Sequence, residues 1–98
     1  IDEFVKEQGL KKIDFIKIDV EGAEYDALKG AVGTFKKFRP KSILAIHPEP
    51  IKAKGDSLEA IYDLVKDIGY TAIYNDKPVT KEYFCSLTDL LDLHLIPA

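Results

Sequence analysis

The sequence predicts an α/β fold in which helices cover a largely parallel sheet. Short apolar segments alternate with segments of helical periodicity, and the apolar segments lack the strict polar alternation of a strand with one solvated face. The chain has 98 residues, of which 46% are hydrophobic, enough for one small domain or a piece of a larger one. It starts at Ile1 and contains no methionine, so we expect residues 1–98 to form a single partial domain.

The first half of the chain predicts helices around two apolar strands. A short helix begins at Asp2, whose side chain can cap it, and ends before Gly9. The first strand is apolar on both faces, and the prolines of the sequence HPEP end the second. In chain order, we predict a helix at Asp2–Gln8, a strand at Ile13–Val20, helices at Gly22–Lys29 and Ala31–Phe38, and a strand at Ser42–Ile46.

The second half contains the clearest helix, Ser57–Ile68, whose apolar residues recur with the 3.6-residue period. Asp56 and Glu59 have the spacing of a capping box at its start, and Gly69 suits its end. Beyond it we predict a strand at Tyr70–Tyr74, a turn at Asn75–Lys77, a segment of ambiguous structure at Tyr83–Asp92 and a last short strand at Leu93–Ile96.

Candidate site residues follow directly after two of the predicted strands. Ligands of parallel α/β sheets bind beyond the carboxyl ends of the strands, which selects Asp19 to Glu24 and His47 to Glu49. Asp19 and Glu21 could bind a cation, a substrate hydroxyl or an ammonium group. Alternatively, Glu21 and Glu24 only stabilise the N-terminus of the following helix, an effect of roughly 0.3–1 kcal/mol.

His47 is the candidate general base, because a histidine near neutral pH can accept the proton of a hydroxyl group. A proline follows it, so its loop is stiff, and Glu49 is close enough in sequence to orient the ring. The alternative is a histidine packed at a strand end with both nitrogens satisfied. We interpret His94 as structural and Cys85 as an inert thiol.

Lys17 is an unusual residue within an apolar strand. Side chains alternate along a strand, so Lys17 and Asp19 share one face. Either a carboxylate such as Asp19 pairs with the ammonium group, or the lysine stem extends to water, because an unpaired buried charge is costly. A third interpretation is that Lys17 helps to hold the geometry or charge of a site.

Composition argues against several classes of partner. The net charge is -3, the pI is about 5.3, and no more than two basic residues are adjacent, so nucleic acid is not expected as a partner. No apolar run approaches the roughly 20 residues of a membrane helix, and no signal-peptide pattern is present. The single cysteine excludes an internal disulfide and a cysteine-based metal site. We expect a cytoplasmic protein that does not bind membranes.

Two segments together resemble the FkbM-type methyltransferases. They are IDFIKIDVEGAEYDALKGA, which starts at Ile13, and ILAIHPE, which starts at Ile43. The match is dense at KIDVEGAE and LKGA and looser over the rest of the chain. The family's enzymes are class I Rossmann-like methyltransferases that depend on S-adenosylmethionine and methylate hydroxyl groups of sugars and other small molecules.

The resemblance implies a place in the fold and a set of roles. The class I strand order is 3-2-1-4-5-7-6, and this chain would supply strands 4 to 7, mostly parallel with an antiparallel last strand. Asp19, Val20 and Glu21 would lie at the cofactor, with Asp19 also at the catalytic centre. The acceptor side would be formed by Glu21, Glu24, His47 and Glu49, and His47 would be the general base.

One departure from the family pattern is large. No G-x-G sequence occurs in the chain, so the glycine-rich cofactor loop is missing together with the first half of the fold. We therefore expect the chain alone to be inactive, and its binding of S-adenosylmethionine is not expected to be tight. Without a neighbouring strand, Ile13–Val20 would be a sheet edge, which we expect to pair in a homodimer or with the missing N-terminal half.

Two other functions remain open at this point. The chain could be a non-catalytic α/β module that serves for docking or regulation. It could also be part of a metal-dependent, glycosyltransferase-like enzyme in which Asp19 and Glu21 bind a divalent cation. We expect no metal in the methyltransferase interpretation.

Overall fold

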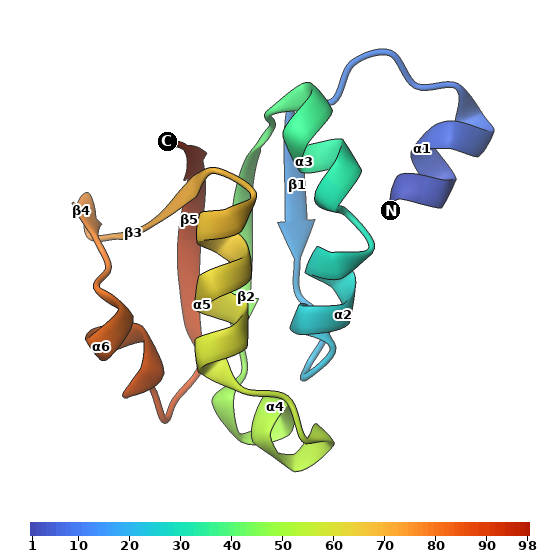
Figure 1. The fold of residues 1–98 in the computed structure, drawn as a ribbon. Helices are drawn as coiled ribbons and strands as arrows, with labels where there is room; N and C mark the ends of the chain where they lie inside the picture. Colours follow the sequence, from blue (N-terminus) through green and yellow to red (C-terminus); the bar gives the residue numbers. More distant parts are fainter.

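A computed structural model describes all 98 residues and contains one five-stranded sheet (Figure 1). The strands are β1 (Phe15–Ile18), β2 (Lys41–Ile46), β3 (Tyr70–Tyr74), β4 (Lys77–Pro78) and β5 (Leu91–Pro97). Their order across the sheet is β1-β2-β5-β3-β4, which places β1 at one edge and β4 at the other. The prediction of an α/β fold is therefore confirmed.

The last strand, β5, makes the sheet mixed. β1 and β2 pair in parallel, but β5 enters between β2 and β3 and is antiparallel to both, and β4 is antiparallel to β3. The predicted largely parallel sheet is wrong in this respect, because three of the four pairings are antiparallel. The antiparallel last strand was predicted correctly, and β1, β2 and β3 do point in the same direction.

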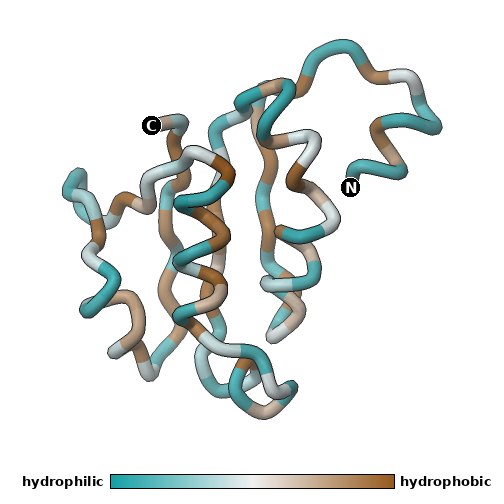
Figure 2. The backbone as a smooth tube through the Cα atoms, in the orientation of Figure 1, coloured by the Kyte–Doolittle hydropathy of each residue, from teal (hydrophilic) through white to brown (hydrophobic).

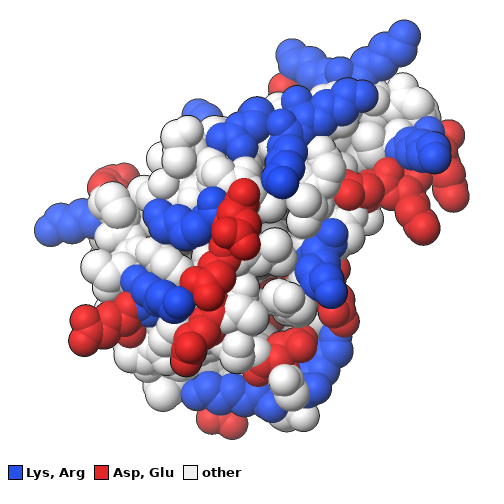
Figure 3. Space-filling model, in the orientation of Figure 1, with Lys and Arg blue, Asp and Glu red and all other residues white.

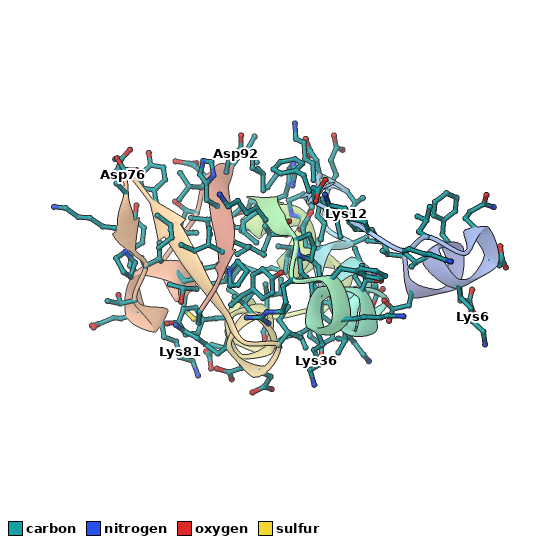
Figure 4. The ribbon with its side chains drawn as sticks, turned by 90° about the horizontal axis from the view of Figure 1, so that it is seen from above. Lys6, Lys12, Lys36, Asp76, Lys81 and Asp92 are labelled. Atoms are coloured by element: carbon teal, nitrogen blue, oxygen red, sulfur yellow. The ribbon has the colours of Figure 1, made fainter.

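Six helices accompany the sheet: α1 (Asp2–Gln8), α2 (Glu24–Lys29), α3 (Val32–Phe38), α4 (Pro48–Lys54), α5 (Leu58–Asp67) and α6 (Lys81–Cys85). The view from above shows α2, α3 and α5 on one face of the sheet and no helix on the other (Figure 4). Lys36 and Lys81 project from the helical side, whereas Asp92 and Asp76 lie on the opposite side (Figure 4). α1 stands beyond the β1 edge, next to α3 (Figure 1).

The hydrophobic core lies between the sheet and the helical layer. Ile18, Leu44 and Leu93 are register partners across β1, β2 and β5, and each is at most 2% exposed. Phe35 of α3 and Ile61 of α5 are fully buried against this row. Burying one such side chain contributes about 1.5–3 kcal/mol. Apolar stretches of the strands and of these helices run side by side in Figure 2.

The uncovered face of the sheet is partly apolar and open to solvent. On β1, Phe15 is 54% exposed and Lys17 is exposed, and on β5 Ile96 is 38% exposed and His94 is exposed. The expectation that helices cover both faces of the first strand is therefore wrong. Lys17 forms no ion pair with Asp19 or any other carboxylate, so its side chain takes the solvated alternative.

Helix α4 was not predicted from the sequence, and neither was the two-residue strand β4. The sequence HPEP was interpreted as a break, but Pro48 is the first residue of α4 and His47 is its N-cap. Proline fits the first turn of a helix, where backbone N–H groups have no intrahelical partner. The helix ends at Gly55, whose φ of 95° is left-handed.

Two predicted caps act differently in the structure. α5 is capped by the Ser57 hydroxyl, which accepts from the Ala60 N–H at 3.1 Å, and not by Asp56. Asp2 does not cap its own helix. Its carboxylate instead accepts from the N–H groups of Gly33 and Thr34 at 3.0 and 2.8 Å, and so caps α3.

Asp2 thereby ties α1 to the rest of the molecule. The Thr34 hydroxyl also donates to its carboxylate, at 2.6 Å. Burial raises the pKa of Asp2, but these hydrogen bonds from Thr34 and Gly33 outweigh it, and the pKa is lowered below the usual 3.8. The contact is therefore made with an ionised carboxylate at neutral pH.

The C-terminal third forms a hairpin, a short helix and the return strand. Asn75 and Asp76 have φ of 51° and 63°, which closes a tight β3–β4 hairpin where a turn was predicted. The ambiguous segment contains the end of α6, which begins before it at Lys81, and then the start of β5, which begins two residues earlier than predicted, at Leu91. The longest helix, α5, has 10 residues, about half of what a membrane-spanning helix requires, and no helix qualifies as such a span.

Candidate functional site

The turn after β1 and the start of α4 meet at one end of the sheet. β1 and β2 are parallel neighbours, so their carboxyl ends lie side by side. The turn carries Asp19 to Ala23 and leads into α2, whose first residue is Glu24. The end of β2 carries His47. The structure thus brings together the two strand ends that the sequence selected.

The imidazole of His47 lies between two carboxylates. Its Nδ1 is 3.1 Å from Oε1 of Glu24, and its Nε2 is 3.4 Å from Oδ1 of Asp19. The contact with Glu24 has the geometry of a hydrogen bond, whereas the contact with Asp19 is close enough for an ion pair only. The cluster therefore joins β1, α2 and the N-terminus of α4 through one ring.

Exposure to solvent rises steadily across this cluster. The side chain of Glu24 is 0% exposed, that of His47 is 15% exposed and that of Asp19 is 49% exposed. The Glu24 side is therefore closed, whereas the Asp19 side is an open rim. The imidazole is therefore more open to a ligand toward Asp19 than toward Glu24.

Gly22 permits the close contact between the turn and α4. Its N–H donates to Oε1 of Glu24 at 2.9 Å, and its φ is 105°. A Cβ atom at this position would lie 2.9 Å from Cβ of Pro50 and 3.0 Å from the Pro50 carbonyl carbon and oxygen. Backbone atoms cannot move aside easily, so only glycine fits here.

The remaining predicted site residues line the surface near the cluster. Val20 is 45% exposed, and Glu21 and Glu49 are exposed as well. Glu49, which was expected to orient His47, makes no hydrogen bond to it, and Glu24 holds that position. The sequence contains no direct signal for this, since the burial of Glu24 depends on packing against distant segments.

The chain holds one free thiol and no cluster of metal-binding side chains. No group of three or more His, Cys, Asp and Glu side chains is arranged to hold a metal ion. Cys85 is a free thiol whose pKa is raised by burial and by the nearby Glu59 carboxylate, which keeps it protonated. Acidic and basic side chains are interspersed over the helical layer, with basic ones gathered near α3 and the loop after α1 (Figure 3).

The site is a rim and not an enclosed pocket. A cleft of about 520 Å³ lies between α1 and α3, lined by Lys6, Lys37 and Phe38 among others, and it contains neither Asp19 nor His47. The arrangement at the strand ends can hold a polar ligand group against Asp19 and exchange a proton with Nε2 of His47.

Comparisons with known proteins give one family and one relative. The family model described as the methyltransferase FkbM domain matches residues 1–72. AMB antimetabolite synthetase AmbE of Pseudomonas aeruginosa is 29% identical over 104 residues, a match that covers 94% of this chain and 5% of that protein. The chain therefore spans about one twentieth of the length of this relative. No solved structure matches the chain.

Replacing Gly22 by alanine is expected to cost more stability than the same change at Gly55. Both glycines have left-handed φ, of 105° and 95°, but a Cβ at Gly55 meets no atom within 4 Å. Backbone strain of roughly 1–2 kcal/mol is common to both variants. The collision with Pro50 adds about 1–3 kcal/mol in Gly22→Ala alone. Urea denaturation measures both, and equal losses would show that the turn is not pressed against α4.

Proposed function

Because the chain belongs to the FkbM methyltransferase domain family, we propose that it forms the acceptor side of an S-adenosylmethionine-dependent O-methyltransferase. The acceptor is a hydroxyl group of a small molecule or a sugar. The observation that carries the proposal is His47, a proton acceptor held at the open rim of the sheet beside Asp19. The antimetabolite synthetase among the similar proteins favours a small-molecule acceptor.

The strand order supports the placement within a class I methyltransferase. The order β1-β2-β5-β3 corresponds to strands 4-5-7-6 of that fold, with the last strand of the chain inserted antiparallel between its neighbours. In this arrangement, β1 is the strand next to the cofactor half. The rim after β1 and β2 then faces the reaction centre, as the rule for open α/β sheets requires.

The described residues fit one end of the cofactor and not the whole of it. Asp19 and Glu21 offer partly exposed carboxylates beside Val20, a surface suited to a cationic group such as the amino group of the cofactor's methionine end. A glycine-rich loop for the rest of the cofactor is absent from the sequence. S-adenosylmethionine supplies an electrophilic methyl group when it is bound.

His47 is the general base in this proposal. Its Nε2 would take the proton of the acceptor hydroxyl, whose oxygen would receive the methyl group as the bond from that methyl to the sulfonium sulfur breaks and leaves a neutral thioether. Asp19, 3.4 Å from Nε2, stabilises the resulting imidazolium. The rate depends further on the alignment of the reacting atoms, which the stiff turn and the start of α4 support.

The metal-dependent alternative has little support. Asp19 and Glu21 do not belong to any group of side chains arranged to hold a metal ion. The docking alternative keeps one supporting observation, the uncovered sheet face. That face is equally the surface on which the rest of an enzyme would pack.

Replacing His47 by alanine in the complete methyltransferase that carries this chain should lower kcat by about 10²–10⁴, as expected for a general base. The assay follows tritiated methyl transfer from S-adenosylmethionine to a panel of sugars and hydroxylated small molecules. His94→Ala is the matched control, because His94 is exposed on β5 and should stay within about threefold of the parent. A loss below about threefold for His47→Ala would remove His47 from the mechanism.

The β1 edge is the proposed attachment point for the remaining part of the enzyme. The outer side of β1 has no partner strand, and Phe15 and Val20 leave 54% and 45% of their surfaces exposed beside it. In the isolated chain, the edge of a second copy can take the same place, which would give a homodimer.

Light scattering of the isolated chain should therefore show association at high concentration. Phe15→Lys should weaken it, because it places a charge at the edge. Tyr83→Lys is the control, since Tyr83 is 47% exposed but lies on α6, on the opposite side of the sheet from β1 (Figure 1). A monomer at every concentration, or equal effects of both variants, would contradict pairing at β1.

A further inference from the structure

We propose that Glu24 is a positioning residue that keeps the imidazole proton of His47 on Nδ1 and so leaves Nε2 free to act as the base. The catalytic meaning of this role rests on the proposed function. The hydrogen bond itself does not, because it is a property of the folded chain. It assigns to Glu24 a task different from substrate contact, for which its fully buried side chain offers no surface.

Two carboxylates compete for the single proton of a neutral imidazole. Glu24 is closer, at 3.1 Å from Nδ1, than Asp19, at 3.4 Å from Nε2. Water cannot donate hydrogen bonds to Glu24, because its side chain is 0% exposed, whereas the Asp19 side chain is 49% exposed. Water can replace a lost donor at Asp19 and cannot do so at Glu24, so the proton stays on the Glu24 side.

The hydrogen-bond inventory of Glu24 strengthens this conclusion. Its Oε1 accepts from the Gly22 N–H at 2.9 Å and contacts Nδ1 of His47, while Oε2 is buried and has no partner. A buried carboxylate with so few donors is poorly stabilised. Removing the Nδ1–H would leave it with one neutral N–H, so the folded structure favours the tautomer that donates to it.

The carboxylate is also held in place from outside the pair. Gly22 lies so close to α4 that an added Cβ atom would be 2.9 Å from Cβ of Pro50, and the same turn leads into the start of α2, where Glu24 lies. His47 is the N-cap of α4, and its neighbour Pro48 is buried. The ring and the carboxylate therefore come from two elements that are pressed together, which suits a fixed orientation.

The consequence concerns the nitrogen that faces the rim. With the proton on Nδ1, Nε2 carries a lone pair and points to the half-exposed side of the cluster. An acceptor hydroxyl that approaches beside Asp19 then meets a nitrogen ready to take its proton. In the opposite tautomer, Nε2 would carry a hydrogen and could not act as a base.

Nitrogen NMR of the 98-residue chain tests the tautomer directly. The sample is labelled with ¹⁵N-histidine and measured at a pH where the ring shifts show that His47 is neutral. We expect a pyrrole-type Nδ1 and a pyridine-type Nε2, the reverse of the preference of free histidine. A His47 that is mainly Nε2-protonated would overturn the proposal, and this result requires no variant.

Two alanine variants separate the carboxylates. Glu24→Ala should move His47 to the Nε2-protonated tautomer, with Asp19 as its acceptor. Asp19→Ala, the matched control on the other nitrogen, should leave the proton on Nδ1. An unchanged tautomer in a folded Glu24→Ala chain would reduce Glu24 to a structural role. If that variant does not fold, the wild-type spectrum decides.

The tautomer found by NMR and the activity of the His47→Ala enzyme test the two proposals separately. An Nδ1-protonated His47 together with full activity of the His47→Ala enzyme would refute the general base and leave the positioning of the ring intact. A large loss of activity with an Nε2-protonated ring would refute the role of Glu24, while His47 would remain necessary for the reaction.

Discussion

A buried carboxylate determines how the functional end of this molecule is built. Glu24 lies at the start of α2 without exposed surface, and it accepts from the turn at Gly22 and from His47 at the start of α4. Burying a carboxylate is costly unless donors surround it, so the turn after β1 and the end of β2 have to stay together. The parallel pairing of β1 and β2 supplies that proximity, and Gly22 permits it against Pro50.

The sequence predicts well those features that depend on local pattern. α1 and β3 have the predicted bounds, and the positions of Asp19 and His47 at neighbouring strand ends follow from the rule for α/β sheets. Features that depend on tertiary contacts are harder to predict from the sequence. The insertion of β5 was implied by the strand order of the family and by no local pattern. The burial of Glu24 and its preference over Glu49 as partner of His47 depend on which distant segments pack together. The missed α4 is different, because a proline at a helix start was read as a break.

The uncovered sheet face explains why the site is open to solvent and where further protein could pack against it. Helices pack on one face of the sheet only, and β1 is an edge strand without a partner on its outer side. No element covers the rim at Asp19, which stays open to solvent. Apolar side chains such as Phe15 and Ile96 remain exposed where a covering layer would bury them. The half-exposed Asp19 and the buried Glu24 lie on opposite sides of the His47 imidazole. Asp19 is placed to contact a ligand, and Glu24 is placed to hold the ring.

The most direct test of this account is a double-mutant cycle between Glu24 and His47, measured as the free energy of unfolding in urea. Glu24→Ala, His47→Ala and the double variant complete the cycle with the parent chain. A hydrogen bond to a buried carboxylate predicts a coupling of about 1–3 kcal/mol between the two residues. Additive losses, with a coupling below about 0.5 kcal/mol, would mean that the two side chains are merely neighbours and would contradict the account.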